Sequence, residues 1–278
     1  MNMKWLHGGP LAFMARALKR APTSGKFVIL CQARTGSNLL ADLLNQFDDI
    51  RCLGEIFKRR SVGLPGDLRC RMGMTWRERD LYPLTYMNRL FGLLDEPIVG
   101  FRMFPRHNRF MLSYVSEAVE IKKVVLQRNP VDSFISFKHA ISTNQWRKRR
   151  SDRSDRKENT GETIKFDESE FERYVSVGEK YFDLIRRCEK HTGQQFHWLD
   201  YDLLKEIEPV RDVARFLGSS GNAPTLKPRI VKQITRPKNE TISNYEEMIS
   251  YLELRYPKLV PAREADKDEK IGPKFKVA

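Results

Sequence analysis

A strand, a tight loop and a helix follow one another where the folded part of this sequence begins. Residues 27–31 form a continuous apolar run, which is typical of a strand buried on both faces of a parallel sheet. Residues 34–37 (Arg-Thr-Gly-Ser) interrupt that run, and leucines then recur at helical spacing up to Leu44. This order constrains the fold more than any other feature, because strands joined through helices build a parallel sheet.

The alternation of strands and helices continues along the chain. Further buried strands are expected at 98–104, 124–126 and 196–199. Helices are expected at 110–120, 131–145, 171–188, 210–217 and 245–255. Such a pattern predicts an α/β protein with one parallel sheet between helical layers, a three-layer α/β/α arrangement.

Composition narrows the class of protein and its organisation. The chain has 278 residues, of which 40% are hydrophobic and 10% aromatic, and this excludes a disordered or collagen-like chain. No apolar run approaches the roughly 20 residues that a membrane-spanning helix needs. The four cysteines are scattered without metal-ligand spacing, so we expect reduced thiols and no metal site. We expect a basic leader at 1–25, one domain at 26–262 and a charged tail at 263–278.

The chain is strongly basic, with 50 Lys and Arg against 36 Asp and Glu and a net charge of +14. A nucleic-acid-binding protein is therefore one interpretation, although no zinc finger, RRM pattern or basic region with heptads is present. The charge is unevenly distributed, because the segments 1–26, 58–79 and 147–157 contribute +5 each.

The first loop, residues 32–38, has the chemistry of an anion site. Gly36 allows a close approach of the backbone to a ligand, and Arg34 offers planar, permanently charged donors. The N–H groups at the start of the following helix attract anions. An ATP-binding P-loop would need GxxxxGK[ST], which this loop lacks, so a kinase or ATPase is disfavoured. Taken alone, the loop also fits an ordinary capped turn.

A second candidate anion site follows the strand at 124–126. Arg128 lies at the end of that strand, at the sheet edge where open α/β folds bind ligands. Ser136 comes eight positions later, on the helix that follows. The two side chains can hold one phosphate together, although in isolation they fit a surface arginine and a helical serine.

Together, the two stretches resemble the cofactor-binding motifs of sulfotransferases that use 3′-phosphoadenosine 5′-phosphosulfate (PAPS). Further segments are similar to that family in the same order, at 53–57, 100–104, 141–146, 199–204 and 241–247. The resemblance is greatest to bacterial carbohydrate sulfotransferases of the trehalose, nodulation-factor and lipopolysaccharide type. It implies a P-loop-like sulfotransferase fold.

The resemblance implies PAPS as sulfuryl donor, bisphosphoadenosine as product and no metal. It places the 5′-phosphosulfate at the first loop, on Arg34, Thr35, Gly36, Ser37 and Asn38. Arg34 is also expected to stabilise the leaving group. The 3′-phosphate is expected at Arg128 and Ser136, with Ser133 as a second hydroxyl nearby.

The acceptor hydroxyl needs a base. Glu55 is the candidate, because it follows the second-strand region beside the first loop and matches a glutamate of the related bacterial enzymes. His107 is the rival, since histidine titrates near neutral pH. Arg102 and Trp146 are candidate acceptor-binding residues.

The implied acceptor is a carbohydrate or glycolipid hydroxyl. We interpret the basic segments as attracting an anionic acceptor or an anionic membrane surface, which suits a cytoplasmic enzyme at the inner membrane face. No nucleic acid is expected, and homo-oligomerisation stays open. A catalytically inactive PAPS-binding protein is the remaining alternative.

Overall fold

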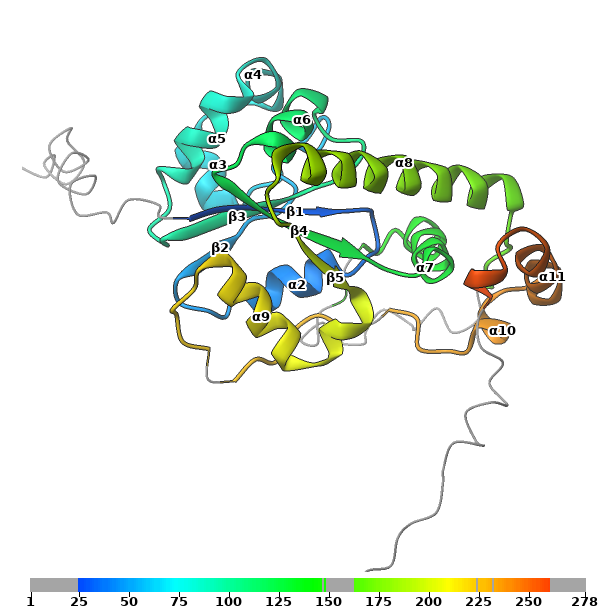
Figure 1. The fold of residues 1–278 in the computed structure, drawn as a ribbon. Coiled ribbons are helices and arrows are strands. Elements are labelled where there is room, and N and C mark those ends of the chain that lie inside the picture. Colours follow the sequence, from blue (N-terminus) through cyan, green and yellow to red (C-terminus); the bar gives the residue numbers. More distant parts are fainter. Residues whose placement is uncertain (1–24, 147, 149–162, 224, 232, 261–278) are drawn as a thin grey trace, which may run out of the picture.

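The computed structural model describes residues 25–146, 148, 163–223, 225–231 and 233–260 (Figure 1). The leader before residue 25, the charged tail and all of the basic segment 147–157 except Lys148 lie outside this part. The described residues contain one sheet of five parallel strands in the order β2-β3-β1-β4-β5. The strands are β1 (Gly25–Cys31), β2 (Ile50–Cys52), β3 (Ile98–Met103), β4 (Ile121–Gln127) and β5 (His197–Asp200).

β1 is the central strand and pairs with β3 on one side and β4 on the other. Its side chains alternate between two hydrophobic cores, with Val28 and Leu30 on one face and Phe27, Ile29 and Cys31 on the opposite face. A strand covered on both faces requires an uninterrupted apolar sequence. The predicted parallel sheet is confirmed.

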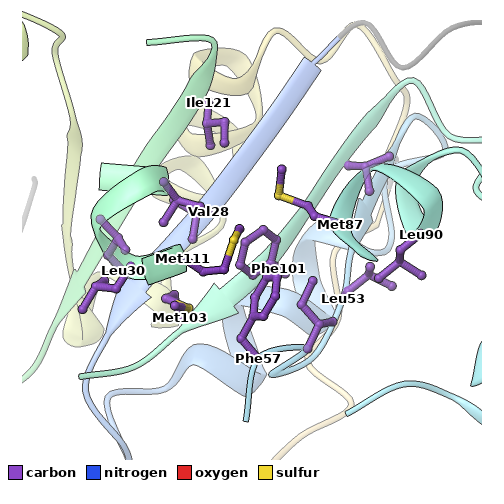
Figure 2. Packing of buried hydrophobic residues seen from close by; sticks show 14 of the residues in the cluster. Val28, Leu30, Leu53, Phe57, Met87, Leu90, Phe101, Met103, Met111 and Ile121 are labelled. Atoms are coloured by element: carbon purple, nitrogen blue, oxygen red, sulfur yellow. The ribbon is translucent and has the colours of Figure 1, made fainter. Parts of the chain in front are cut away.

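One face of the sheet is covered by a group of helices that includes the segment between β2 and β3 (Figure 1). These helices are α3 (Gly66–Met72), α4 (Trp76–Leu81), α5 (Pro83–Phe91), α6 (Arg109–Glu117) and α8 (Glu168–Thr192). Met87 and Leu90 of α5 and Met111 of α6 pack toward Phe101 and Val28 of the sheet (Figure 2). Although α8 has 25 residues, no helix in the described part of the chain is both long and apolar enough to span a membrane.

The opposite face of the sheet is covered by α2 (Ser37–Leu44) and α9 (Ile207–Leu217). A third cluster lies beside the sheet, where α7 (Pro130–Ser142) and α11 (Tyr245–Arg255) pack against the first half of α8. Short helices complete the described elements: η1 (Tyr201–Lys205), α10 (Lys238–Thr241) and η2 (Pro257–Leu259). The predicted α/β/α layering is confirmed.

The differences from the sequence-based expectation are local. The helix expected over 110–120 ends at Glu117, because the chain enters β4 at Ile121. The segment covered by α3, α4 and α5 had no predicted structure. Thr75 and Glu78 form a capping box at the start of α4, so the Thr-x-x-Glu spacing was a usable signal there.

Gly100 gives a test of this packing. It lies opposite Phe27 in the β1–β3 register, and a Cβ at residue 100 would come within 2.5 Å of the Phe27 ring. We expect Gly100→Ala to lower the free energy of unfolding by about 1–3 kcal/mol, as overpacking does, in a urea titration. Gly66→Ala is the matched control, because nothing lies within 4 Å of its added Cβ. Equal stability of the two variants would contradict the described contact.

Candidate functional site

The C-terminal ends of the strands surround a cavity of about 450 Å³. Each strand is followed by a lining residue: Arg34 after β1, Glu55 after β2, Phe104 after β3, Arg128 after β4 and Tyr201 after β5. This edge is where open α/β sheets bind ligands. The candidate residues from distant parts of the sequence therefore meet at one place.

The backbone of the first loop takes a conformation that requires a glycine at residue 36. Arg34 and Gly36 both have left-handed conformations, with φ of 69° and 90°. A Cβ on Gly36 would also collide with the Tyr201 ring, so this position needs glycine for two reasons. Gly36 caps α2 without a side-chain hydrogen bond, and Ser37 and Asn38 of the first turn line the cavity. Thr35 is buried, and its hydroxyl donates to the carbonyl of Gln32 at 2.8 Å.

The second motif, the stretch from Arg128 to Ser136, is fixed by a helix cap. The side chain of Asn129 accepts from the N–H of Val131 at 2.9 Å at the start of α7. Arg128, immediately before this cap, donates to the Arg34 carbonyl at 3.0 Å. Its guanidinium also stacks on the Tyr201 ring, 4.1 Å from the ring centroid. Arg128 thus joins the first loop to the strand end that carries the second motif.

The Arg34 side chain in turn connects the first loop to the second motif. Its Nε donates to the Ser136 hydroxyl at 2.9 Å, and its Nη1 donates to the Trp146 carbonyl at 2.7 Å. Nη2 donates to the side-chain oxygen of Gln233. Burial, and next the charge of Arg128, lower the pKa of Arg34, but a guanidinium stays protonated in proteins. A full positive charge therefore lies between the two motifs, bonded to neutral acceptors.

Glu55 and His107 lie in contact, although the sequence analysis treated them as rivals. Glu55 Oε2 lies 3.4 Å from His107 Nε2. The N–H of Phe104 donates to His107 Nδ1 at 3.2 Å, so in the neutral imidazole the proton is on the nitrogen facing Glu55. Glu55 lines the cavity, whereas His107 is 7% exposed and lies behind it.

Opposing effects act on the pKa of Glu55. Burial alone would raise the pKa of this carboxyl, but the His107 hydrogen bond and the charges of Arg102, His107 and Lys58 outweigh it, and the pKa is lowered. Glu55 is therefore a carboxylate at neutral pH, held by a neighbouring donor at the cavity wall.

The remaining predicted site residues divide into two groups. Trp146, Ser37 and Asn38 line the cavity with Ser136. Arg102 is buried beneath the first loop, where it donates to the Asn38 side chain at 2.7 Å, and does not line the cavity. Ser133 is 1% exposed, lies beside the Tyr174 hydroxyl and also does not line the cavity.

The cavity wall is predominantly cationic. Its basic side chains are Arg34, Lys58, Arg128, Lys148, Arg236 and Lys238. Its acidic side chains are Glu55 and Asp132, and Asp132 pairs with Lys238 at 2.9 Å. Sequence reasoning missed Lys58 and Gln233, since no motif marks either one. The basic side chains of the wall suit a ligand with several negative charges. The described residues contain no group of three or more His, Cys, Asp or Glu that could hold a metal ion.

The chain is similar to several known proteins. No protein-family model matches the chain. A sulfotransferase from Alicyclobacillus acidocaldarius is 23% identical, covers 86% of this chain and 94% of its own, and has a TM-score of 0.48. The sulfotransferase domain from the curacin biosynthetic pathway is 14% identical, covers 94% and 95%, and has a TM-score of 0.45.

In sequence, the chain is 25% identical over 232 residues to Nodulation protein H of Rhizobium tropici, covering 82% of this chain and 89% of that protein. This match extends the motif resemblance over most of the chain. The chain therefore resembles sulfotransferases in its motifs and is similar in sequence to this relative.

The Glu55–His107 contact can be tested by titration. His107→Phe removes the donor and its charge, so we expect the pKa of Glu55 to rise. The measurement is a carboxyl ¹³C NMR titration, assigned by the signal that Glu55→Gln removes. The exposed His191 of α8 gives the control, His191→Phe, which should leave the titration unchanged. An unchanged midpoint in His107→Phe would contradict the contact.

Proposed function

We propose that the enzyme transfers the sulfuryl group of PAPS to a carbohydrate hydroxyl, with residues 26–262 acting as one catalytic domain. One observation carries the proposal: the two motifs are interlocked at one cavity. Arg128 bonds the Arg34 carbonyl, while the Arg34 side chain bonds Ser136. A donor with a phosphate at each end of a ribose needs two such anion sites a short distance apart.

The first loop is proposed to hold the 5′-phosphosulfate through the N–H groups at the start of α2. Arg128 and Ser136 are proposed to hold the 3′-phosphate. Arg34 exchanges its neutral acceptors, such as the Gln233 amide, for phosphate oxygens, because hydrogen bonds between charged partners are stronger. Its charge then stabilises the negative charge that develops on the departing phosphate.

Glu55 is proposed as the base, because it reaches the cavity and His107 does not. The acceptor oxygen forms a bond to sulfur while the bond from sulfur to the bridging oxygen of the donor breaks, and bisphosphoadenosine leaves. The acceptor proton passes to the Glu55 carboxylate. His107 holds the carboxylate in position through the 3.4 Å contact. As in phosphoryl transfer, positioning and charge stabilisation supply most of the acceleration.

The acceptor is proposed to be a sugar hydroxyl on a saccharide or glycolipid. The resemblance to bacterial carbohydrate sulfotransferases supports this, as does the position of Trp146 in the cavity wall. We further propose a cytoplasmic enzyme that contacts an anionic membrane surface through its basic segments. A screen with labelled PAPS over trehalose, chito-oligosaccharides and lipopolysaccharide tests the acceptor class.

Glu55→Gln tests the base. We expect this variant to bind bisphosphoadenosine as the wild type does, because Glu55 is assigned to the acceptor hydroxyl and not to a phosphate, and to lose about 10²–10⁴-fold in turnover. Binding is measured by thermal shift and turnover with labelled PAPS. Glu246→Gln, on the exposed side of α11, carries the same charge change and should keep full activity. Wild-type turnover in Glu55→Gln would reject the assignment.

Arg128→Met tests the 3′-phosphate site. We expect bisphosphoadenosine to bind roughly 10- to 100-fold more weakly, because a hydrogen bond to a charged group is worth about 1.5–3 kcal/mol. AMP lacks the 3′-phosphate, so its affinity should fall less, through loss of the contact with the Arg34 carbonyl alone. Calorimetry with both nucleotides measures the difference, and Ser136→Ala should show a smaller effect of the same kind. Equal losses for both nucleotides would contradict the assignment.

A further inference from the structure

The chain turns back on itself immediately after Glu55. The N–H of Lys58 donates to the Glu55 carbonyl at 3.0 Å, and the N–H of Ser61 donates to the Lys58 carbonyl at 3.4 Å. Lys58, Arg59 and Arg60 occupy this turn, all three are exposed, and we call them the basic turn. Lys58 lines the cavity, as Glu55 does.

A buried arginine holds the basic turn in one conformation. Arg79 of α4 is 0% exposed, and its Nη1 donates to the carbonyls of Ile56 at 2.9 Å and Ser61 at 2.5 Å, one on each side of the turn. Burying a guanidinium is costly unless its donors find acceptors. Gly63 adds a second restraint, because a Cβ there would lie 2.5 Å from the Glu55 carbonyl oxygen. The turn and the base are therefore positioned as one unit.

The basic turn carries three positive charges, and that of Lys58 acts on the neighbouring Glu55 carboxylate. The ion pairs of the described part of the chain include none of Lys58, Arg59 and Arg60. Arg60 also has a left-handed backbone, with φ of 54°, which a non-glycine residue adopts at a cost. Three neighbouring like charges on a restrained turn repel one another, and a bound anion would relieve that repulsion.

The position of the basic turn separates it from the proposed donor sites. The donor phosphates are assigned to the first loop and to Arg128 with Ser136. Glu55 is the group that contacts the acceptor hydroxyl, and the basic turn begins three residues after it. Lys58 of the turn lines the same cavity as Glu55, so the turn begins beside whatever is attached to that hydroxyl.

We propose that the basic turn binds a carboxylate or phosphate of the acceptor, so the enzyme sulfates an anionic saccharide close to its existing negative charge. This inference rests on the proposed function and specifies the acceptor class. Arg79 is a positioning residue in this scheme, because it acts through the backbone of the turn.

Two matched pairs of probes test the proposal on the enzyme saturated with bisphosphoadenosine. Tetragalacturonic acid is compared with its methyl ester, and trehalose 6-phosphate with trehalose, so that each pair differs in charge. In one of the two pairs, calorimetry should show that the charged member binds at least tenfold more tightly than the neutral one. A preference in the first pair indicates a carboxylate site, and a preference in the second pair indicates a phosphate site. Absence of a preference in both pairs, including absence of binding, overturns the proposal.

The variant K58Q/R59Q/R60N should abolish the preference and still bind bisphosphoadenosine at its two phosphate sites. Asparagine is used at residue 60 because it tolerates the left-handed conformation. The control R69Q/R89Q/R187Q removes the same charge from exposed positions that do not line the cavity, and it should keep the preference. A preference that persists in the first variant overturns the proposal. Failure of bisphosphoadenosine to bind the wild type would overturn the proposed function as well, which separates the two failures.

Discussion

The site depends on one contact, between the left-handed Gly36 and the Tyr201 ring that lies against it. Arg128 stacks on the same ring and bonds the Arg34 carbonyl. The ends of β1, β4 and β5 are thereby tied together by a glycine, an aromatic ring and a guanidinium. Any side chain at residue 36 would push the ring away and release Arg128, so the geometry of both anion sites follows from this close approach.

Charged groups of two kinds lie around that contact. Cationic side chains and helix N–H groups occupy the region around Arg34 and Arg128. Glu55, with His107 behind it, supplies a negative group at another part of the wall. The separation suits a reaction in which one end of the site holds an anionic leaving group while the other removes a proton. Arg79, which sequence reasoning did not mark, fixes the loop that carries this carboxylate.

Sequence patterns predicted the features that depend on neighbouring residues. The apolar run at 27–31 predicted a doubly covered strand, and the Asn-Pro pair at 129–130 predicted the start of α7. Contacts between distant residues were not predictable in this way. Glu55 and His107 are 52 positions apart, and their contact arises from the register of β2 and β3. Arg102 lies within a strand that is buried along its whole length, so alternation could not tell whether its side chain faces the cavity or the loop above it.

The central claim is that one cavity holds a nucleotide with the 5′-phosphate at the first loop and the 3′-phosphate at Arg128 and Ser136. A crystal structure of the complex with bisphosphoadenosine tests it most directly. We expect the 5′-phosphate on the N–H groups at the start of α2, the 3′-phosphate bonded to Arg128 and Ser136, and Arg34 released from Gln233. A nucleotide bound elsewhere, or bound with its two ends exchanged, would contradict it.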